Sequence, residues 1–278
     1  MDRIRRALDL ARRDRARLVG AQTGGAGVGE QPAAPKRAGD VLASIPYTNT
    51  RAFEPTPALL ESNRIVDPSA HTTAAAAFRM LRTQMLQRMD EKGWRSIAIL
   101  SPNADDGKTT TAINLALSLA ADHRHTVLLV DCDLKQPSIA QKLGITPELG
   151  LNDVLSGAAR VEQCLYRAAG VDRFVVLPGR ASLVSSSEAL SGHRGREVVT
   201  ELRVRYPERL ILFDLPPILT ADDALAFLPL VECGLMIVAE GVTPRQDLLR
   251  CMELVSNTPI VGIALNRCTT PVAAYGTG

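Results

Sequence analysis

Short apolar runs alternate with amphipathic stretches over most of the chain after residue 70. Buried strands of a parallel sheet appear as continuous apolar runs, whereas helices on a sheet repeat apolar positions every three or four residues. The continuous runs predict strands at residues 96–100, 126–130, 173–177, 210–213, 235–239 and 259–265. The helical spacing predicts helices at residues 72–92, 111–117, 138–143, 150–155, 161–168, 195–205 and 244–254.

The order of these elements predicts the fold class. No two predicted strands are joined by a tight hairpin turn, so the connections should be right-handed crossovers. We therefore predict an α/β fold with a doubly wound, mostly parallel sheet and helices on both faces. The serine-rich stretch 178–192 is predicted to be a loop. Ligands of such sheets bind at the carboxyl ends of the strands.

The first 70 residues follow a different pattern. Residues 1–19 place apolar side chains on one helical face and arginines on the rest, which predicts a basic amphipathic helix. Such a helix can lie on an anionic membrane or dock on a partner, and a solvated helix or a disordered basic arm fits equally well. Residues 20–70 are rich in Gly, Ala and Pro and predict a flexible linker. We assign the folded domain to residues 71–270 and a C-terminal tail to residues 271–278.

Composition narrows the function classes. The chain has 278 residues, of which 46% are hydrophobic and 22% charged, enough to bury a full α/β core. A net charge of +2 and an aromatic content of 4% argue against nucleic-acid binding. No apolar stretch approaches the length of a membrane span, so we expect a cytoplasmic protein. The five cysteines form no C-x-x-C pair, which predicts reduced, mostly buried thiols.

A phosphate-binding motif follows the strand at 96–100. The loop after this strand ends in Gly107-Lys108-Thr109-Thr110 and leads into a helix, as in P-loop NTPases. Lys108 supplies a cation for the β- and γ-phosphates, Gly107 allows close backbone approach, and the Thr109 hydroxyl suits Mg²⁺. One departure is Pro102, which stands where the usual pattern has its first glycine.

Carboxylates end two other predicted strands. Asp131 and Asp133 follow the second strand and, being two residues apart, point the same way. Asp214 ends the fourth strand, where the carboxylate of a P-loop enzyme orders metal-bound water. The carboxyl ends of parallel strands share one edge, so we predict that these acids meet Lys108 there.

Three motifs in a fixed order carry a family resemblance. The first is residues 107–110, the second is Asp131, Asp133, Lys135 and Pro137, and the third is residues 213–217. With them, from about Thr73 to Tyr275, the sequence resembles the bacterial tyrosine kinases of exopolysaccharide synthesis, most closely their exosortase-associated autokinase branch. Further agreement comes from residues 1–17, from residues 77–83, which are similar to the family's self-association helix, and from residues 187–191.

The resemblance implies an ATP-dependent protein-tyrosine autokinase that regulates exopolysaccharide or capsule synthesis and export. It implies ATP and Mg²⁺ as cofactors and Asp131 as the group that accepts the tyrosine proton. The implied catalytic residues are Lys108, Asp131, Asp133 and Asp214. The implied nucleotide-binding residues are Asp106, Gly107, Lys108, Thr109, Thr110, Asn266 and Arg267. The implied metal-binding residues are Thr109, Asp131, Asp133 and Asp214.

The resemblance also implies partners. It predicts a homo-oligomer that associates through Arg79 and Arg82, although Ala76 stands where the family has a glutamate. Tyr275, the single tyrosine of the tail, would be phosphorylated by a neighbouring subunit. A chain-length-determining membrane protein, the polysaccharide co-polymerase, would stimulate the kinase and hold it at the inner face of the plasma membrane. Residues 1–18 would add a peripheral membrane contact.

Two other functions fit the same motifs. A ParA- or MinD-like ATPase would transfer the phosphoryl group to water, but its signature lysine would stand at Asn103. A non-catalytic nucleotide-sensing regulator of a co-polymerase would bind nucleotide without transferring phosphate. Incubation with labelled ATP separates the three, because they yield phosphotyrosine, free phosphate or neither.

Overall fold

The computed structural model describes residues 50–122, 124–171 and 173–269. The predicted basic helix, the predicted linker up to residue 49 and the tail with Tyr275 lie outside the described residues. Among the residues described, no helix combines the length and apolarity needed to cross a bilayer. The five cysteines form no disulfide in the structure and only Cys268 is exposed, which confirms that the thiols are mostly buried.

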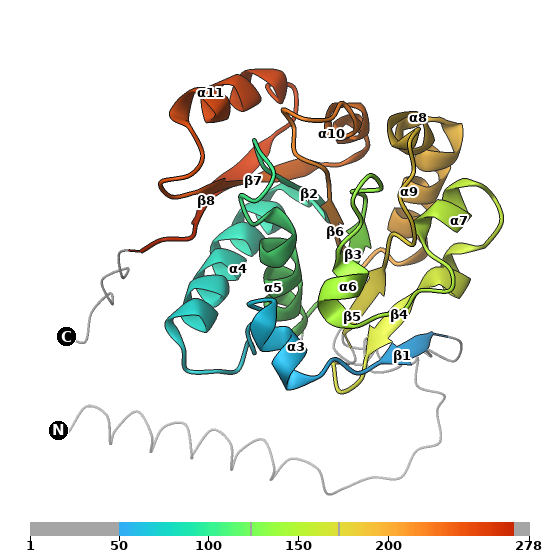
Figure 1. Ribbon diagram of the computed structural model, residues 1–278, viewed down its shortest axis with the longest axis horizontal. Helices are drawn as coiled ribbons and strands as arrows, with labels where there is room; N and C mark the ends of the chain where they lie inside the picture. The colour runs from blue at the N-terminus through green and yellow to red at the C-terminus, as the bar shows by residue number, and fades with distance from the viewer. Residues whose placement is uncertain (1–49, 123, 172, 270–278) are drawn as a thin grey trace, which may run out of the picture. The chain divides into compact units, whose positions relative to one another are not determined.

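Within these residues the strands form one sheet of eight in the order β1-β4-β5-β3-β6-β2-β7-β8 (Figure 1). The strands are β1 (Arg51–Phe53), β2 (Ser96–Leu100), β3 (Thr126–Asp131), β4 (Tyr166–Ala168), β5 (Phe174–Leu177), β6 (Arg209–Asp214), β7 (Cys233–Ala239) and β8 (Ile260–Asn266). Every neighbouring pair is parallel except β4 and β5. The predicted mostly parallel α/β fold is confirmed.

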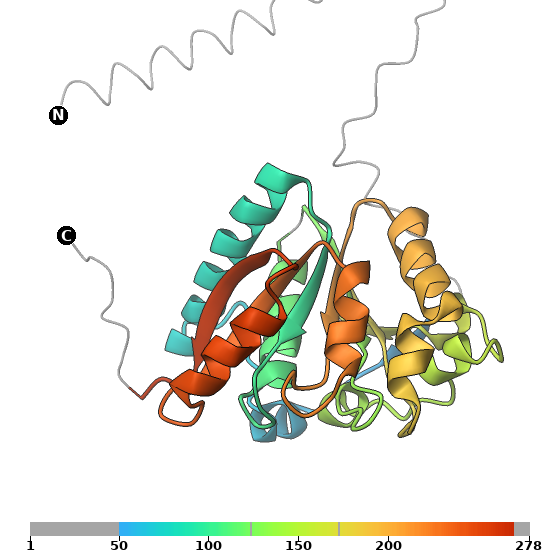
Figure 2. The same ribbon diagram turned by 90° about the horizontal axis from the view of Figure 1, so that it is seen from above.

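Helices cover both faces of the sheet (Figure 2). They are α3 (Pro57–Ser62), α4 (Thr73–Lys92), α5 (Lys108–Ala120), α6 (Ile139–Leu143), α7 (Leu151–Leu155), α8 (Ser186–Ser191), α9 (His193–Arg205), α10 (Asp223–Phe227) and α11 (Arg245–Leu254), with 3-10 helices η2 (Val161–Cys164) and η3 (Leu228–Leu230). Side chains of α4 and α5 belong to the core on one face, and those of α9, α10 and α11 to the core on the other. The strands between them are therefore buried on both sides.

Both ends of helix α4 are set by residues beside it in the sequence. The Thr72 side chain accepts a hydrogen bond from the Ala75 amide at 3.2 Å and caps the first turn. Gly93 ends the helix in the left-handed conformation, with φ of 69°. Met85 and Met89, in the C-terminal half of α4, are buried in the core beside the sheet, which agrees with the helical spacing that predicted this helix.

Three sequence predictions are wrong in detail. The predicted helix 161–168 is the short η2 followed by β4, because residues from 166 on pair between β1 and β5. The predicted loop 178–192 contains α8, which is stabilised by a tertiary contact described below. Part of the predicted linker 20–70 is regular structure, because residues 51–53 form β1 paired with β4 and residues 57–62 form α3 capped by Thr56. For β1 and β4, pairing with distant strands overrides weak local propensity.

Candidate nucleotide site

The sheet register brings the predicted acids together. Strand β6 lies between β3 and β2, and Asp214 at its end is directly opposite Asp131 on one side and Ile99 on the other. The phosphate-binding loop follows β2 at the same edge, and α5 begins at Lys108. Three adjacent parallel strands therefore deliver the loop and both acidic segments to one rim.

The loop is shaped by residues at the end of β8. Gly107 adopts φ of 87°, and a Cβ at this position would lie 2.0 Å from Nδ2 of Asn266. The same Asn266 amide donates to the Asp106 carbonyl at 2.9 Å. Arg267 donates to the carbonyl of Asp105, which has φ of 63°. The family resemblance implies that Asn266 and Arg267 bind nucleotide, and in the structure both donate hydrogen bonds to carbonyls of the loop backbone.

Asp106 supports the loop from inside. Its carboxylate is buried and accepts hydrogen bonds from the Asn103 amide at 2.9 Å and from the Thr243 hydroxyl at 2.6 Å. The Asn103 side chain donates to Asp247 of α11 at 2.9 Å. Thr243 and Asp247 therefore help to hold the loop, and no motif in the sequence marks them, because they lie far along the chain.

Lys108 is paired with the acid of the third motif. Its ammonium group lies 2.7 Å from Oδ1 of Asp214, and Thr109 donates to Oδ2 of the same carboxylate at 2.6 Å. Asp133 is more distant, with Oδ2 at 4.0 Å from the Lys108 ammonium. Lys108 is 6% exposed and Asp214 is fully buried. The predicted meeting of this lysine with the acids at one rim is present in the structure.

Asp131 is a buried carboxylate with one free oxygen. Its Oδ2 accepts hydrogen bonds from the Ser138 and Ile139 amides at 3.1 and 3.0 Å. Its Oδ1 is buried without a hydrogen-bond partner among the described residues. Burial, followed by the nearby Asp214 charge, raises the pKa of Asp131 to about 8. Burial also raises the pKa of Asp133, against the opposing effect of Lys108.

The donor set suits a hard cation, but only together with a nucleotide. Carboxylate and hydroxyl oxygens are the ligands that Mg²⁺ prefers, and Thr109, Asp131, Asp133 and Asp214 supply them. In the part of the chain that the structure describes, no three His, Cys, Asp or Glu side chains converge closely enough to hold an ion. Phosphate oxygens would have to complete the coordination, as is usual for Mg²⁺. The Oδ1 atom of Asp131, which has no hydrogen-bond partner among the described residues, is an oxygen that such an ion could use.

The predicted association residues contact their own chain. Arg79 donates to the carbonyls of Pro68 and Ala70 at 2.8 and 3.0 Å. Arg82 donates to the Ser118 carbonyl at the end of α5 at 2.7 Å. These contacts fix α4 against the segment before it and against α5.

The described tyrosines are packed. Tyr166 is 4% exposed, and its hydroxyl accepts from the Glu148 amide and donates to the Leu149 carbonyl. Tyr206 is half-buried and stacks under the Arg209 guanidinium at 4.0 Å.

Comparison with known proteins places this site in a family. The sequence profile described as an AAA domain matches residues 94–238, which include the loop, the acidic segments and the strands that carry them. The chain belongs to the AAA domain family. The resemblance of this chain to bacterial tyrosine kinases is confirmed, because its relatives and structural neighbours include proteins of that name.

Three similar proteins illustrate the match. The succinoglycan biosynthesis transport protein ExoP of Rhizobium meliloti strain 1021 is 31% identical over 74% of this chain and 26% of its own. The tyrosine-protein kinase YwqD of Bacillus subtilis strain 168 is 25% identical over 74% of this chain and 86% of its own. The crystal structure of the VpsO kinase domain is 29% identical, with a TM-score of 0.63, and covers 70% of this chain and 96% of its own. The present chain thus spans about a quarter of the length of ExoP but most of the length of YwqD.

Proposed function

We propose that this chain transfers the γ-phosphoryl group of ATP to tyrosine hydroxyls, including its own, and thereby regulates exopolysaccharide or capsule synthesis and export. The observation that carries the proposal is the contact of Lys108 and Thr109 with Asp214, beside the Asp131–Asp133 segment. The names of YwqD and of the VpsO kinase domain support a kinase, and the name of ExoP supports a role in polysaccharide synthesis.

The chain's own residues account for the parts of such a reaction. The loop amides around Gly107 would bind the phosphates, and Lys108 would follow the β- and γ-phosphates. Mg²⁺ held by Thr109 and the acids would offset charge on the phosphate oxygens. The tyrosine oxygen would form a bond to the γ-phosphorus as the bond to the bridging oxygen breaks and ADP leaves.

Asp131 is the proposed proton acceptor. A tyrosine hydroxyl has an ordinary pKa of about 10, so its proton must pass to a nearby base during transfer. Burial raises the pKa of Asp131, and a carboxylate with a raised pKa is a stronger base than an exposed aspartate. Its Oδ1 has no hydrogen-bond partner among the described residues and would receive the proton, while Asp133 supports the metal.

The proposed phosphate acceptor is Tyr275 of a neighbouring subunit. Tyr166 and Tyr206 are both packed, and the hydroxyl of Tyr166 is engaged with backbone groups, so neither suits transfer from another subunit. Transfer between subunits requires self-association, which we assign to α4 with Arg79 and Arg82. We further propose that a chain-length-determining membrane protein stimulates the kinase and keeps it at the membrane.

Mass spectrometry after incubation with Mg·ATP tests the proposal. We expect phosphate on Tyr275, strong loss of phosphotyrosine in Tyr275→Phe, and no change in Tyr206→Phe as the matched control. Release of free phosphate without phosphotyrosine would instead support the ParA- or MinD-like ATPase. Nucleotide binding with neither product would support a non-catalytic regulator. Activity should rise when the cytosolic tail of the membrane partner is added, and full activity without it would contradict that part of the proposal.

A further inference from the structure

A loop that the mechanism above does not use braces the segment carrying Asp131 and Asp133. We call residues 178–185, which directly precede α8, the bracing loop. The Leu183 amide donates to the Leu134 carbonyl at 2.8 Å, and the Ser182 hydroxyl donates to the Lys135 carbonyl at 2.9 Å. These hydrogen bonds hold the bracing loop against the two residues that directly follow Asp133.

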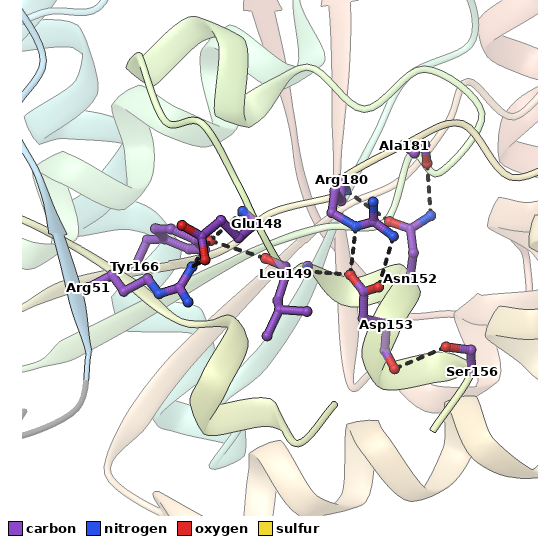
Figure 3. Close-up of polar contacts among 10 residues, drawn as sticks. Arg51, Glu148, Leu149, Asn152, Asp153, Ser156, Tyr166, Arg180 and Ala181 are labelled. Atoms are coloured by element: carbon purple, nitrogen blue, oxygen red, sulfur yellow. Dashed lines mark hydrogen bonds and ion pairs between the residues drawn. The ribbon is translucent and has the colours of Figure 1, made fainter. Parts of the chain in front are cut away.

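The first end of the bracing loop is fixed to α7 (Figure 3). The Arg180 guanidinium donates to both oxygens of Asp153, with distances of 2.8 and 2.9 Å. The Arg180 amide also donates to the side-chain carbonyl of Asn152 at 2.9 Å, and Asn152 donates back to the Ala181 carbonyl at 2.8 Å. A bidentate arginine–carboxylate pair fixes direction as well as distance, so this end is tightly held.

The second end leads into α8, whose first residue contacts a buried acid at the start of α10. Asp223 is fully buried, and the Ser186 hydroxyl donates to its Oδ1. Its Oδ2 lies 2.6 Å from the ammonium group of Lys135. A buried carboxylate must be paired and hydrogen-bonded to remain charged, and Lys135 and Ser186 meet both needs. Asp223 therefore joins α8, α10 and the segment after β3.

The side chain of Asp133 has little support of its own. Its Oδ1 accepts a hydrogen bond from the Gln136 amide at 3.2 Å, and its Oδ2 is 4.0 Å from Lys108. Its position at the rim is therefore decided mainly by the backbone that follows it. That backbone is held by the bracing loop and by the pairing of Lys135 with Asp223.

We propose that Lys135 and Asp223 are positioning residues that hold Asp133 where it can support the metal of a bound Mg·nucleotide. The proposal rests on the proposed function of this site and specifies how the site is kept in shape. Neither residue needs to touch the nucleotide. Their contribution should therefore be visible in the metal-dependent part of nucleotide binding.

Calorimetric titration of ADP, with Mg²⁺ and with EDTA, tests this in the full chain. Supports of metal-site residues are commonly worth 10- to 100-fold in metal affinity, so we expect Lys135→Met to weaken Mg·ADP binding about tenfold or more. Binding of ADP in EDTA should change less than about threefold, because the loop around Lys108 is untouched. Lys135→Arg should restore Mg·ADP binding, because it keeps the charge facing Asp223.

Controls separate positioning from loss of fold. Lys92→Met, at the exposed last turn of α4, should leave both titrations unchanged. If Lys135→Met does not fold, Ser186→Ala removes only the hydroxyl that supports Asp223 and should produce a smaller loss of the same kind. Equal losses with Mg²⁺ and with EDTA would indicate a merely structural role and overturn the proposal, and so would unchanged Mg·ADP binding.

Failure of the positioning role and failure of the proposed kinase function give different results. A wild-type chain that binds Mg·ADP but forms no phosphotyrosine would contradict the kinase assignment and leave the positioning role of Lys135 measurable. A wild-type chain whose ADP affinity does not depend on Mg²⁺ would overturn the positioning role.

Discussion

The ammonium group of Lys108 lies 2.7 Å from a carboxylate oxygen of Asp214, and both side chains are buried. Thr109 donates to the other oxygen of the same acid. The first and third motifs are thus joined by one buried ion pair across β2 and β6. Such a pair costs desolvation of both charges, so each partner depends on the other.

Removing Lys108 should reduce both stability and activity, and removing the charge of Asp214 as well should restore only the stability. Lys108→Met leaves Asp214 buried without its cation, so we expect a loss of roughly 3–5 kcal/mol in the free energy of unfolding. Phosphotyrosine formation should also be lost. The double variant Lys108→Met/Asp214→Asn should regain much of the stability but no activity. Urea denaturation and phosphotyrosine detection measure the two effects, and a double variant no more stable than Lys108→Met would contradict the pairing.

Gly107 should be replaceable only at the expense of nucleotide binding. A Cβ at this position would meet Asn266 at 2.0 Å, and φ is 87°. We expect Gly107→Ala to weaken Mg·ADP binding tenfold or more, that is, by about 1.4 kcal/mol. Gly157→Ala is a matched control, because Gly157 has φ of 78° and open space around it. The control should lose about 1–2 kcal/mol of stability and keep its affinity, as measured by calorimetry.

The pair between Asp153 and Arg180 should make stability depend on pH. Hydrogen bonding to the Arg180 guanidinium lowers the pKa of Asp153 below its ordinary value. A carboxylate whose pKa is lower in the folded state adds stability above its unfolded pKa of about 4, and this stability is lost as pH falls through the folded value. We therefore expect Asp153→Asn to cost about 1–2 kcal/mol at pH 7 and progressively less below pH 4.

Urea denaturation at pH 7, 5 and 3 measures this difference. Asp90→Asn serves as the control, because Asp90 and Arg95 form an exposed pair at 3.0 Å that should contribute little at any pH. A difference between wild type and Asp153→Asn that stays constant down to pH 3 would show that charge is not the cause.

Self-association should depend on α4. If α4 mediates contact between subunits, Arg79→Ala/Arg82→Ala should sediment at lower mass than wild type in the presence of Mg·ATP. Both arginines also bind carbonyls of their own chain, so the variant's thermal unfolding should fall by a few degrees. Arg88→Ala, which removes an α4 arginine bound to the Val261 carbonyl, is the control. Identical sedimentation of wild type and double variant would refute association through these residues.

Much of the site could be predicted from local sequence. Asp131 and Asp214 end β3 and β6, and Gly107 and Lys108 close the loop after β2. Parallel strands bring their carboxyl ends to one edge, so these groups could be expected to meet. Apolar runs predicted the central strands correctly, because strands buried on both faces need continuous apolar side chains. The same reasoning failed for β1 and β4, short strands toward the sheet margin whose pairing depends on partners more than 100 residues apart.

Local sequence alone is enough to predict the layered fold and to identify the loop and acidic residues that we propose bind the nucleotide. Which partner each of these groups contacts depends on the tertiary structure. The pairing of Lys135 with Asp223, the support of Asp106 by Thr243, and the contact of Asn266 with the loop join residues 88 to 160 positions apart. Hydrogen bonds and ion pairs act over about 3 Å, so such contacts depend on where the folded backbone places each end, which local propensity does not encode.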